Sequence, residues 1–465
     1  MLFSSLIFLY AFLPLLILIH FAMPKWGRNL ILLLFSLVFY AWGEPKYLFC
    51  ILASISIGYL SGLAIHRYRG RPLAKVSMVA ATVATLGLLG YFKYTDFLIH
   101  TVNSIAGSSI PLLRLALPIG ISFYTFQILS YVIDVYRGRS EVQRNPINFG
   151  AYVVFFPQLI AGPIVRYIDI EKQLRTRQCS WELAYRGAVR FLVGLGKKVL
   201  LANQLGALVQ AFDTSTEPSV FFSWLALIAY MLQLYLDFSG YSDMAIGLGR
   251  IFGFEFPENF NYPFLSVSLS EFWRRWHMTL GTWFRDYVYI PLGGNRVSKG
   301  RWLFNIAVVW GLTGLWHGAG LNFLLWGLIF GAALIGEKLW YGRFLEKKRW
   351  FGHGYVLLIF MLTLVLFRAN DMTGALTGFQ AIFGLNGQPF FNAEAMYYLR
   401  STLVLLVVSA VACTPLPVRL LARCERSALA PVVWVLKPLG LVVIMLLCTA
   451  FLVDGSFNPF LYFRF

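Results

Sequence analysis

Long apolar blocks follow one another along most of the chain, separated by short turns that carry basic residues, glycine or proline. Most blocks are long enough, or nearly so, to cross a hydrocarbon layer about 30 Å thick. Their apolar residues are continuous rather than alternating, which favours spanning helices over the strands of a membrane barrel. We predict about eleven such helices, near residues 2–22, 29–45, 47–65, 76–92, 188–210, 220–237, 302–319, 321–340, 354–368, 400–413 and 433–453. The pattern therefore predicts an all-α, polytopic membrane protein.

Two stretches, near residues 105–185 and 238–300, interrupt this pattern with glycine, proline, asparagine and charged residues. Irregular backbone is tolerated at membrane depth only where it is buried in protein or lines a wet cavity. We therefore expect re-entrant or interfacial helices in both stretches. We expect residues 1–465 to form a single polytopic domain, with its chemistry concentrated near 117–330. The first apolar block has no basic residue before it, so we expect a retained span rather than a cleaved signal peptide.

Charge is scarce and strongly biased toward basic residues. Apolar residues make up 58% of the chain and charged residues 13%, about half the charged share of an ordinary globular protein. The net charge of +18 would suggest nucleic acid binding in a soluble protein, but in a membrane protein basic turns mark the cytoplasmic side. The basic turns at Lys25–Arg28 and Arg67–Lys75 lie two spans apart and are expected on that side. We therefore expect both termini on the periplasmic or extracellular side of the membrane, and no nucleic acid partner.

Several familiar catalytic and metal-binding patterns are missing from the sequence. The five cysteines, which show no CxxC or Cys/His spacing, are Cys50, Cys179, Cys413, Cys424 and Cys448. We therefore predict neither a metal site nor a disulfide framework. The chain also has no GxSxG elbow, no P-loop lysine motif and no HExxH motif, which leaves serine hydrolysis, nucleotide hydrolysis and zinc proteolysis without support.

The segment Glu258–Gly294 is rich in both aromatic and charged residues. On a continuous helix, one face would carry Trp273, Trp276, Leu280, Trp283 and Phe284. The opposite side would carry Glu271, Arg274, Arg275, His277, Arg285 and Asp286, with Glu271 able to pair with an arginine three or four residues later. Two interpretations stay open: a surface helix with a tryptophan belt, or a cavity-lining helix whose basic residues meet an anionic ligand. The turn Pro291–Gly294 ends the helix in either case.

His317 is the best single catalytic candidate, because it is an ionisable residue within the otherwise apolar block Asn305–Gly327. A neutral imidazole with an ordinary pKa can act as a general base, although a buried histidine can also serve only as a hydrogen-bonded packing residue. The stripe Gly311, Gly314 and Gly318 predicts close approach of a second helix.

Two further apolar segments contain polar residues. In Leu234–Phe254, Asp237 and Asp243 are six residues apart and do not share a helical face, so a carboxylate pair of the glycosidase type is disfavoured. Ser242 and Asp243 could instead cap a helix that restarts after Gly240. In Leu117–Gly138, one helical face collects Gln127, Ser130 and Asp134, which could line a polar tunnel or bond a neighbouring helix.

These segments resemble the membrane-bound O-acyltransferase family, in particular its bacterial alginate O-acetyltransferase-like branch. The resemblance rests on NFNYPFLSVSLSEFWRRWHMTLGTWFRDYVYIPLGGNR, DFSGYSDMAIGLGRIFGF, LTGLWHGAGLNFLLWG, FFPQLIAGPIVR and the aromatic tail FNPFLYFRF. It implies helices arranged around a central channel, with a donor entering from the cytoplasm and an acceptor or acyl-carrying partner approaching from outside. It also implies that His317 is catalytic and that His277 is the second functional histidine. Further candidates for lining the donor site and channel are Glu271, Arg274, Arg275, Trp276, Arg285, Asn261, Asp237, Gln127 and Trp316.

The resemblance implies an enzyme that moves an acetyl group across the membrane for O-acetylation of an exported polysaccharide, with alginate as the first choice of acceptor. Acetyl-CoA is the expected acyl donor, and no bound cofactor or metal is expected. A periplasmic acetyltransferase or acyl-carrying protein is the expected partner. The alternatives are peptidoglycan O-acetylation, D-alanyl transfer to teichoic acid, or a transporter or flippase without covalent chemistry. No internal repeat is visible, which weakens the transporter alternative.

Overall fold

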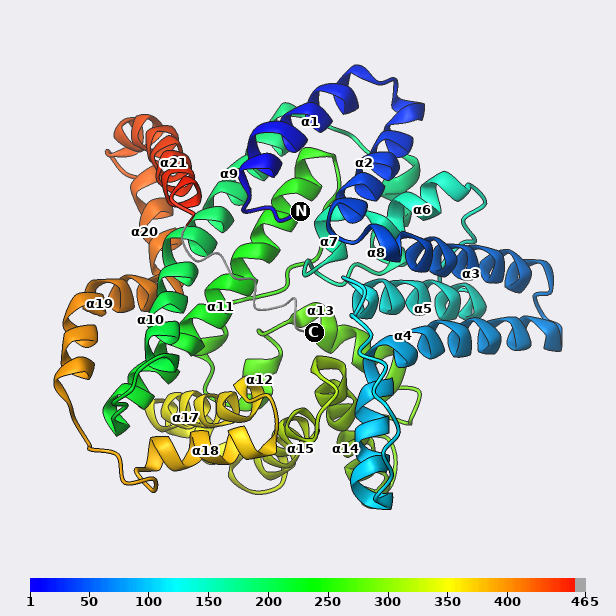
Figure 1. Ribbon diagram of the computed structural model, residues 1–465. Coiled ribbons are helices and arrows are strands. Elements are labelled where there is room, and N and C mark those ends of the chain that lie inside the picture. The colour runs from blue at the N-terminus through cyan, green and yellow to red at the C-terminus, as the bar shows by residue number, and fades with distance from the viewer. Residues whose placement is uncertain (456–465) are drawn as a thin grey trace. The chain divides into compact units, whose positions relative to one another are not determined.

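The computed structural model describes residues 1–455, and every regular element in that part of the chain is helical (Figure 1). These residues fall into two compact units. The first comprises Met1–Arg190 and Ala245–Pro257, and the second comprises Phe191–Met244 and the described residues from Glu258 onward. The division falls within α9 (Trp181–Gly196) and α11 (Val220–Ile251). A single domain over the whole chain stays a prediction, and the aromatic tail at 457–465 lies outside the described residues.

Nine helices within residues 1–455 are long and apolar enough to cross a membrane. They are Lys25–Gly43, Pro45–Arg67, Pro72–Ala106, Trp181–Asp213, Val220–Ile251, Leu321–Lys347, Arg349–Arg368, Ala393–Ala412 and Ala430–Val453. The first apolar block forms a shorter helical stretch, Phe8–Ala22. The predicted span near 302–319 forms α14 (Lys299–His317), which begins with charged residues and is not among these nine helices. The predicted all-α polytopic membrane fold is confirmed, and nine of the eleven predicted spans are among the candidate spans of residues 1–455.

Proline and glycine set many helix ends in the first unit. α4, for example, begins at Pro72 and ends before Gly107, whose φ of +64° suits glycine. The helices that lie wholly in this unit are α1 (Leu13–Ala22), α2 (Arg28–Gly43), α3 (Leu48–Arg67), α4 (Pro72–Ala106), α5 (Ile121–Arg137), α6 (Pro146–Val154), α7 (Phe156–Leu159) and α8 (Tyr167–Arg175).

α5 is the inner helix of the first unit and packs beside α3 and α4 (Figure 1). Every residue from Ile121 to Val132 is buried. α3 approaches closely through glycine, since a methyl group on Gly58 would lie 2.8 Å from the side chain of Ile128. The predicted interruption near 105–185 is confirmed, because α6, α7 and α8 are four to nine residues long and too short to cross a membrane.

The second unit contains the remaining helices. They are α10 (Asn203–Asp213), α12 (Leu269–Trp273), α13 (Met278–Phe284), α14 (Lys299–His317), α15 (Leu321–Gly336), α16 (Gly342–Lys347), α17 (Arg349–Arg368), α18 (Met372–Phe383), α19 (Ala393–Ala412), α20 (Leu416–Glu425) and α21 (Ala430–Val453), together with parts of α9 and α11. Within the apolar 18-residue stretch of α11, 83% of the helix is buried, so α11 is enclosed by protein. The corresponding stretch of α21 is only 6% buried, so α21 exposes its apolar surface.

The expected helix restart after Gly240 is wrong, because α11 continues without a break from Val220 to Ile251. Gly240 serves packing instead. A methyl group on Gly194 of α9 would lie 2.5 Å from the carbonyl oxygen of Gly240, and one on Gly240 would lie 2.8 Å from that of Gly194. The two helices therefore cross where neither carries a side chain, and Ser242 and Asp243 do not cap a helix.

The predicted close approach along the glycine stripe of α14 is confirmed. A methyl group on Gly314 would overlap the backbone oxygen of Phe323, and one on Gly311 would touch Leu324. Gly327 of α15 approaches the backbone of Trp310 in the same way. α14 and α15 therefore form a tight helical hairpin that holds the residues around His317 in place.

Candidate active site

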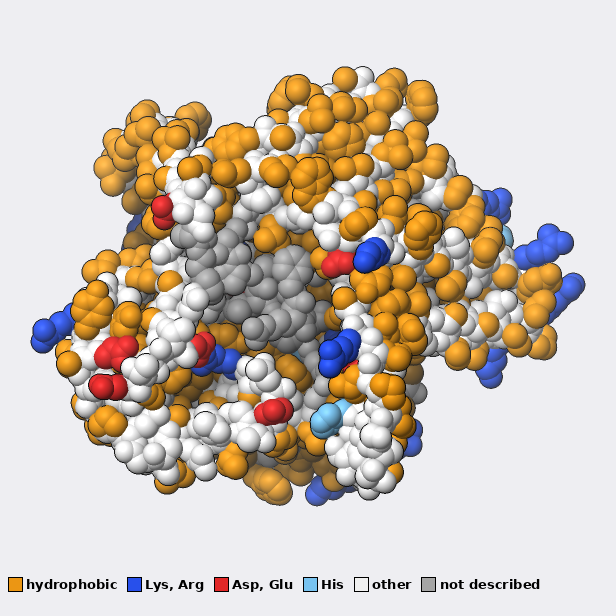
Figure 2. Space-filling model, viewed as in Figure 1, with side chains coloured by type: hydrophobic (Ala, Val, Ile, Leu, Met, Phe, Trp, Pro, Cys, Tyr) orange, Lys and Arg blue, Asp and Glu red, His pale blue; other side chains and the backbone are white. Residues whose placement is uncertain are grey.

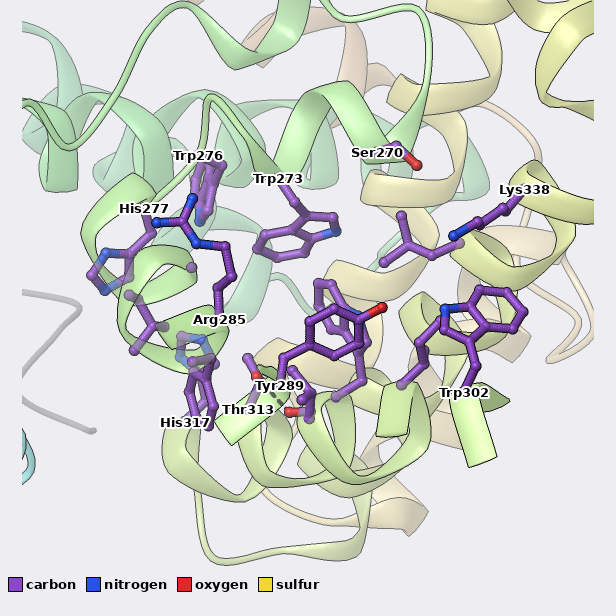
Figure 3. Close-up of a pocket in the computed structure, with 17 residues that line it drawn as sticks. Ser270, Trp273, Trp276, His277, Arg285, Tyr289, Trp302, Thr313, His317 and Lys338 are labelled. Carbon is purple, nitrogen blue, oxygen red and sulfur yellow. Dashed lines mark hydrogen bonds between the residues drawn. The ribbon is translucent and has the colours of Figure 1, made fainter. Parts of the chain in front are cut away.

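A cavity of about 320 Å³ lies within the second unit, bounded by α12, α13, α14 and the end of α15 (Figure 3). Most of its lining is apolar and aromatic. The lining residues are Ser270, Trp273, Trp276, His277, Leu280, Gly281, Phe284, Arg285, Tyr289, Trp302, Ile306, Val309, Trp310, Thr313, His317, Leu334 and Lys338. Both candidate histidines are therefore brought to one cavity, although they are 40 residues apart in sequence.

The cavity follows one face of α14. Its lining residues Trp302, Ile306, Val309, Thr313 and His317 recur every three or four positions, which is one stripe of a helix. From Trp302 to His317 the helix rises about 22 Å, since each residue adds about 1.5 Å. Figure 3 shows the two histidines on one side of the cavity and Trp302 on the other. The site is therefore a long apolar slot with imidazoles at one end.

The other end of the slot is cationic. The Nζ atom of Lys338 lies 4.7 Å from the centre of the Trp302 ring. Nearby, the buried carboxylate of Glu337 accepts hydrogen bonds from the backbone N–H and the hydroxyl of Ser270, at 2.9 and 2.6 Å. Glu337 therefore anchors the start of α12, while Lys338 forms no ion pair with a carboxylate in the part of the chain that the structure describes.

His317 ends α14 instead of lying inside a span as the sequence suggested, since the backbone becomes extended at Gly318. Its buried imidazole is enclosed by aromatic rings, with centroid separations of 5.0 Å to Trp316, 5.0 Å to Trp326 and 5.4 Å to Phe367. Trp316 also contacts the ring of His277, at 5.9 Å. The predicted site residue Trp316 therefore packs against both histidines.

The predicted continuous helix from Glu271 to Asp286 is wrong. α12 ends at Trp273 and α13 begins at Met278. Between them His277 has a φ of +44°, a left-handed backbone conformation that residues other than glycine seldom adopt. Tertiary contacts must therefore stabilise it. Those contacts include the backbone N–H of Met278, which donates to the carbonyl of Asn259 at 3.0 Å. The break turns His277 into the cavity alongside Trp276. The turn at Pro291–Gly294 follows the expectation, with a φ of +103° at Gly293.

Asn259 determines which nitrogen of His277 carries the proton. Its Oδ1 atom lies 3.0 Å from His277 Nδ1 and accepts a hydrogen bond from the Thr279 hydroxyl at 2.9 Å. Its Nδ2 atom donates to Ser242 Oγ at 3.0 Å, which fixes the orientation of the amide. An amide oxygen can only accept, so Nδ1 carries the hydrogen and Nε2 carries the lone pair.

The Nε2 atom of His277 is buried and has no hydrogen-bond partner within the described part of the chain. Residue 277 lies outside the apolar spans, and burial lowers the pKa of its imidazole to about 3. The imidazole is therefore neutral, with one nitrogen occupied by Asn259 and the other available to a substrate.

The predicted charged residues of this segment divide into two groups. Arg285 lines the cavity and pairs with Asp286 at 2.7 Å. The carboxylate of Glu271 pairs with Arg275 at 2.8 Å and accepts the backbone N–H of Val267 at 3.0 Å, which confirms the predicted pairing and gives Glu271 a role in holding the chain. Arg274 is exposed and does not line the cavity. The break at residue 277 turns Arg274 away from this cavity, and its contact with a donor stays a prediction.

Three other predicted site residues lie elsewhere. Asn261 is exposed, and its backbone N–H donates to the carbonyl of Arg275. Asp237 is buried in an ion pair with Lys198 at 2.7 Å and does not line the cavity. Gln127 belongs to the first unit, where its buried side-chain amide has no hydrogen-bond partner in the described residues. A channel role for Gln127 stays a prediction.

Sequence reasoning missed Asn259, Thr313 and Lys338. In NFNYP, asparagines stand at 259 and 261, and nothing in the sequence distinguishes the buried one from the exposed one. Lys338 follows an apolar block and resembles an ordinary basic turn residue, while Thr313 does fall on the same helical face as His317. Residues 1–455 contain no group of three His, Cys, Asp or Glu side chains that could hold a metal ion.

Comparison with known proteins provides evidence about the family of this chain that does not depend on the geometry of the cavity. Residues 135–407 match the model of the membrane-bound O-acyltransferase family. The chain is 41% identical over 392 residues to a probable alginate O-acetylase, AlgI, of Azotobacter vinelandii, covering 82% of this chain and 78% of that protein. It is 36% identical to a peptidoglycan O-acetyltransferase of Helicobacter pylori, covering 83% and 80%. It is 29% identical to a teichoic acid D-alanyltransferase of Bacillus subtilis, covering 50% and 61%.

Proposed function

The chain belongs to the membrane-bound O-acyltransferase family, and from this premise we propose that it transfers an acetyl group from acetyl-CoA to hydroxyl groups destined for an exported polysaccharide. One observation carries the proposal: a long apolar slot has two imidazoles at one end and Lys338 at the other. Arg285 also lies at the imidazole end, but its charge is paired with Asp286. A thioester on a slender arm fits such a slot, with the phosphates of the donor near Lys338 and the acetyl group near His317. This division of charge suits a long donor with one anionic end.

In the proposed reaction, His317 acts as the general base. It takes the proton from the attacking hydroxyl as the oxygen forms a bond to the thioester carbonyl carbon. The carbon–sulfur bond then breaks, and the imidazolium returns the proton to the departing sulfur. His277 would position the donor or the hydroxyl through Nε2, the nitrogen that Asn259 leaves available. Attack by His317 itself on the thioester, giving a transient acyl-imidazole, is a variant of the same scheme.

The orientation completes the proposal. The basic turns at Arg296–Arg301 and Arg343–Arg349 flank the Lys338 end of the slot, so the positive-inside rule assigns that end to the cytoplasm. The donor would then enter from the cytoplasm of a bacterium with an inner membrane. The hydroxyl would approach from the periplasmic side, either on the polysaccharide or on an acyl-carrying partner protein.

Alginate is the acceptor that we propose first, because the A. vinelandii relative at 41% identity is named a probable alginate O-acetylase. The peptidoglycan and teichoic acid enzymes among the relatives make those polymers the next choices. A cell that lacks the chain should export a polysaccharide without ester-linked acetate, and restoring the chain should return the acetate. Unchanged acetate on every exported polymer would contradict the proposal and favour the transporter alternative.

Replacing Asn259 with leucine is expected to lower kcat by about 10- to 100-fold. This loss is smaller than the factor of about 10² to 10⁴ that a general acid–base group contributes, because the imidazole itself remains. The change removes the acceptor that holds the proton on Nδ1 of His277. Because Asn259 does not line the cavity, KM for the acetyl donor should change little. Acetyl transfer by purified protein, measured over a range of pH, is the test.

Two matched variants control this measurement. Asn261→Leu changes an exposed asparagine two residues away and should leave kcat unchanged. Asn259→Asp keeps an oxygen near Nδ1 and should recover part of the lost rate. If Asn259→Leu is well folded and as active as Asn261→Leu at every pH, Asn259 is not a positioning residue.

A further inference from the structure

A second, larger pocket lies in the first unit and is lined mainly by polar and charged side chains. Its volume is about 1350 Å³, above the roughly 300–1,000 Å³ of most small-molecule sites. The pocket lies where α3 ends and α5 gives way to the 138–145 loop, with α8 on a further side. Figure 2 shows Lys and Arg side chains clustered at this end of α3 and α4. The pocket shares no lining residue with the histidine cavity.

Positive charge exceeds negative charge in this pocket. The lining cations are Arg69, Arg139, Arg144, Lys172 and Arg175, and the lining carboxylates are Glu141, Asp169 and Glu171. Two of these carboxylates already form ion pairs: Glu141 pairs with Arg175 at 2.7 Å, and Asp169 pairs with Arg166 at 2.8 Å.

The remaining four cations have no ion pair with a carboxylate among residues 1–455; they are Arg69, Arg139, Arg144 and Lys172. Arg144 instead faces the ring of His66, with its Nη2 atom 3.3 Å from Nε2. The pocket therefore holds four cations outside any ion pair of the described residues and one remaining carboxylate, Glu171, which leaves an excess of positive charge. Such a cluster favours an anion with several acceptor oxygens.

The location of the pocket narrows the class of anion. α3 is a spanning helix that ends at Arg67, and α4 is a spanning helix that begins at Pro72. The loop that carries Arg69 therefore lies where two spans leave the hydrocarbon, at the level of the lipid phosphates. Arginine guanidinium groups match the geometry of phosphate oxygens and bind them with charge-assisted hydrogen bonds.

We propose that this pocket binds the phosphate group of an anionic ligand at the membrane surface. An anionic phospholipid headgroup and a soluble phosphate both present this chemistry. The site is separate from the proposed acyl transfer, and its test uses binding alone, so either proposal can fail without the other.

The test compares the purified full chain with R69Q/R144Q in a neutral detergent. One arm measures binding of phosphatidylglycerol against phosphatidylcholine, and the other measures binding of inorganic phosphate against chloride at the same ionic strength. Removing two cations should weaken binding of the phosphate-bearing ligand by about 25-fold, from roughly a factor of five for each basic residue. The matched control, R423Q/R426Q, removes two basic residues from the end of α20 and should bind like the unmodified chain.

Each outcome decides the proposal. Loss of phosphatidylglycerol binding in R69Q/R144Q, with no specific phosphate binding, supports a headgroup site. Loss of phosphate binding in the same variant, with no preference for phosphatidylglycerol, supports a site for a soluble phosphate. If R69Q/R144Q does not purify in a folded form, R139Q takes its place with an expected loss of about fivefold. Binding of both ligands that is equal in the pocket variant and in R423Q/R426Q overturns the proposal.

Discussion

Replacing His317 with alanine is expected to lower acyl transfer by about two to four orders of magnitude while the protein remains inserted in the membrane. The imidazole lines the cavity at the end of α14, and the proposed reaction needs it to take the proton from the attacking hydroxyl. Packing should suffer little by comparison, because the surrounding rings of Trp316, Trp326 and Phe367 also contact other residues. Ester-linked acetate on the exported polymer, compared with the amount of protein in the membrane, measures the effect.

Two other histidine variants serve as comparisons. His353→Ala alters a histidine that is bonded to the carbonyl of Ser266 and does not line the cavity, so activity should persist. His277→Ala should reduce activity by less than His317→Ala, since His277 is assigned a positioning role. A well-expressed His317→Ala protein that acetylates at nearly the normal rate would remove the assignment of His317 as the base.

Replacing Asp237 with asparagine is expected to lower the free energy of unfolding by about 3–5 kcal/mol, because it leaves a buried ammonium without its counterion. Lys198 and Asp237 are both 2% exposed at their side chains and lie 2.7 Å apart. Lys198 also donates to Asn203 at 3.0 Å, a neutral acceptor that cannot replace the carboxylate. Denaturation of the purified protein in mixed micelles measures the change.

The double variant K198M/D237L should recover much of this loss, since apolar residues of similar size often replace a buried ion pair without penalty. Arg186→Ala is the control, because its pair with Glu182 is exposed and should contribute less than about 1 kcal/mol. If Asp237→Asn keeps its stability but loses acyl transfer, Asp237 contributes to the donor site or channel, for which the sequence made it a candidate, and its structural role is secondary.

The spans were predictable because apolar residues must face lipid or other apolar residues over a fixed length, and this leaves a continuous signal in the sequence. The predicted helix break at Gly240 was wrong because a glycine within an apolar helix can have either of two roles. It can end the helix, or it can allow a second helix to pack closely. Only the tertiary contact with Gly194 shows that the second applies. The glycine stripe of α14 was interpreted correctly because three small residues recur on one face.

The sequence was sufficient to predict the two histidines of the site. It was not sufficient to predict the backbone conformation and the hydrogen bonds that hold them in place. The break at His277 depends on a left-handed backbone at a residue other than glycine, which local propensity disfavours and which contacts with the Asn259 segment stabilise. Once the helix is assumed to be continuous, Arg274 is assigned to the wrong side. The partner of His277 is Asn259, 18 residues earlier, and helical spacing cannot reveal such a contact.

Thiol release from acetyl-CoA by the purified chain in lipid vesicles, with an acceptor hydroxyl supplied, tests the acyl-transfer assignment most directly. The wild-type protein should release coenzyme A together with an equal amount of acetyl ester, and His317→Ala should reduce both by about 10²- to 10⁴-fold. Asn261→Leu, at an exposed position, should leave both unchanged. Release by the wild-type protein that is no faster than from empty vesicles, or that is the same with His317→Ala, would contradict acyl transfer at this site.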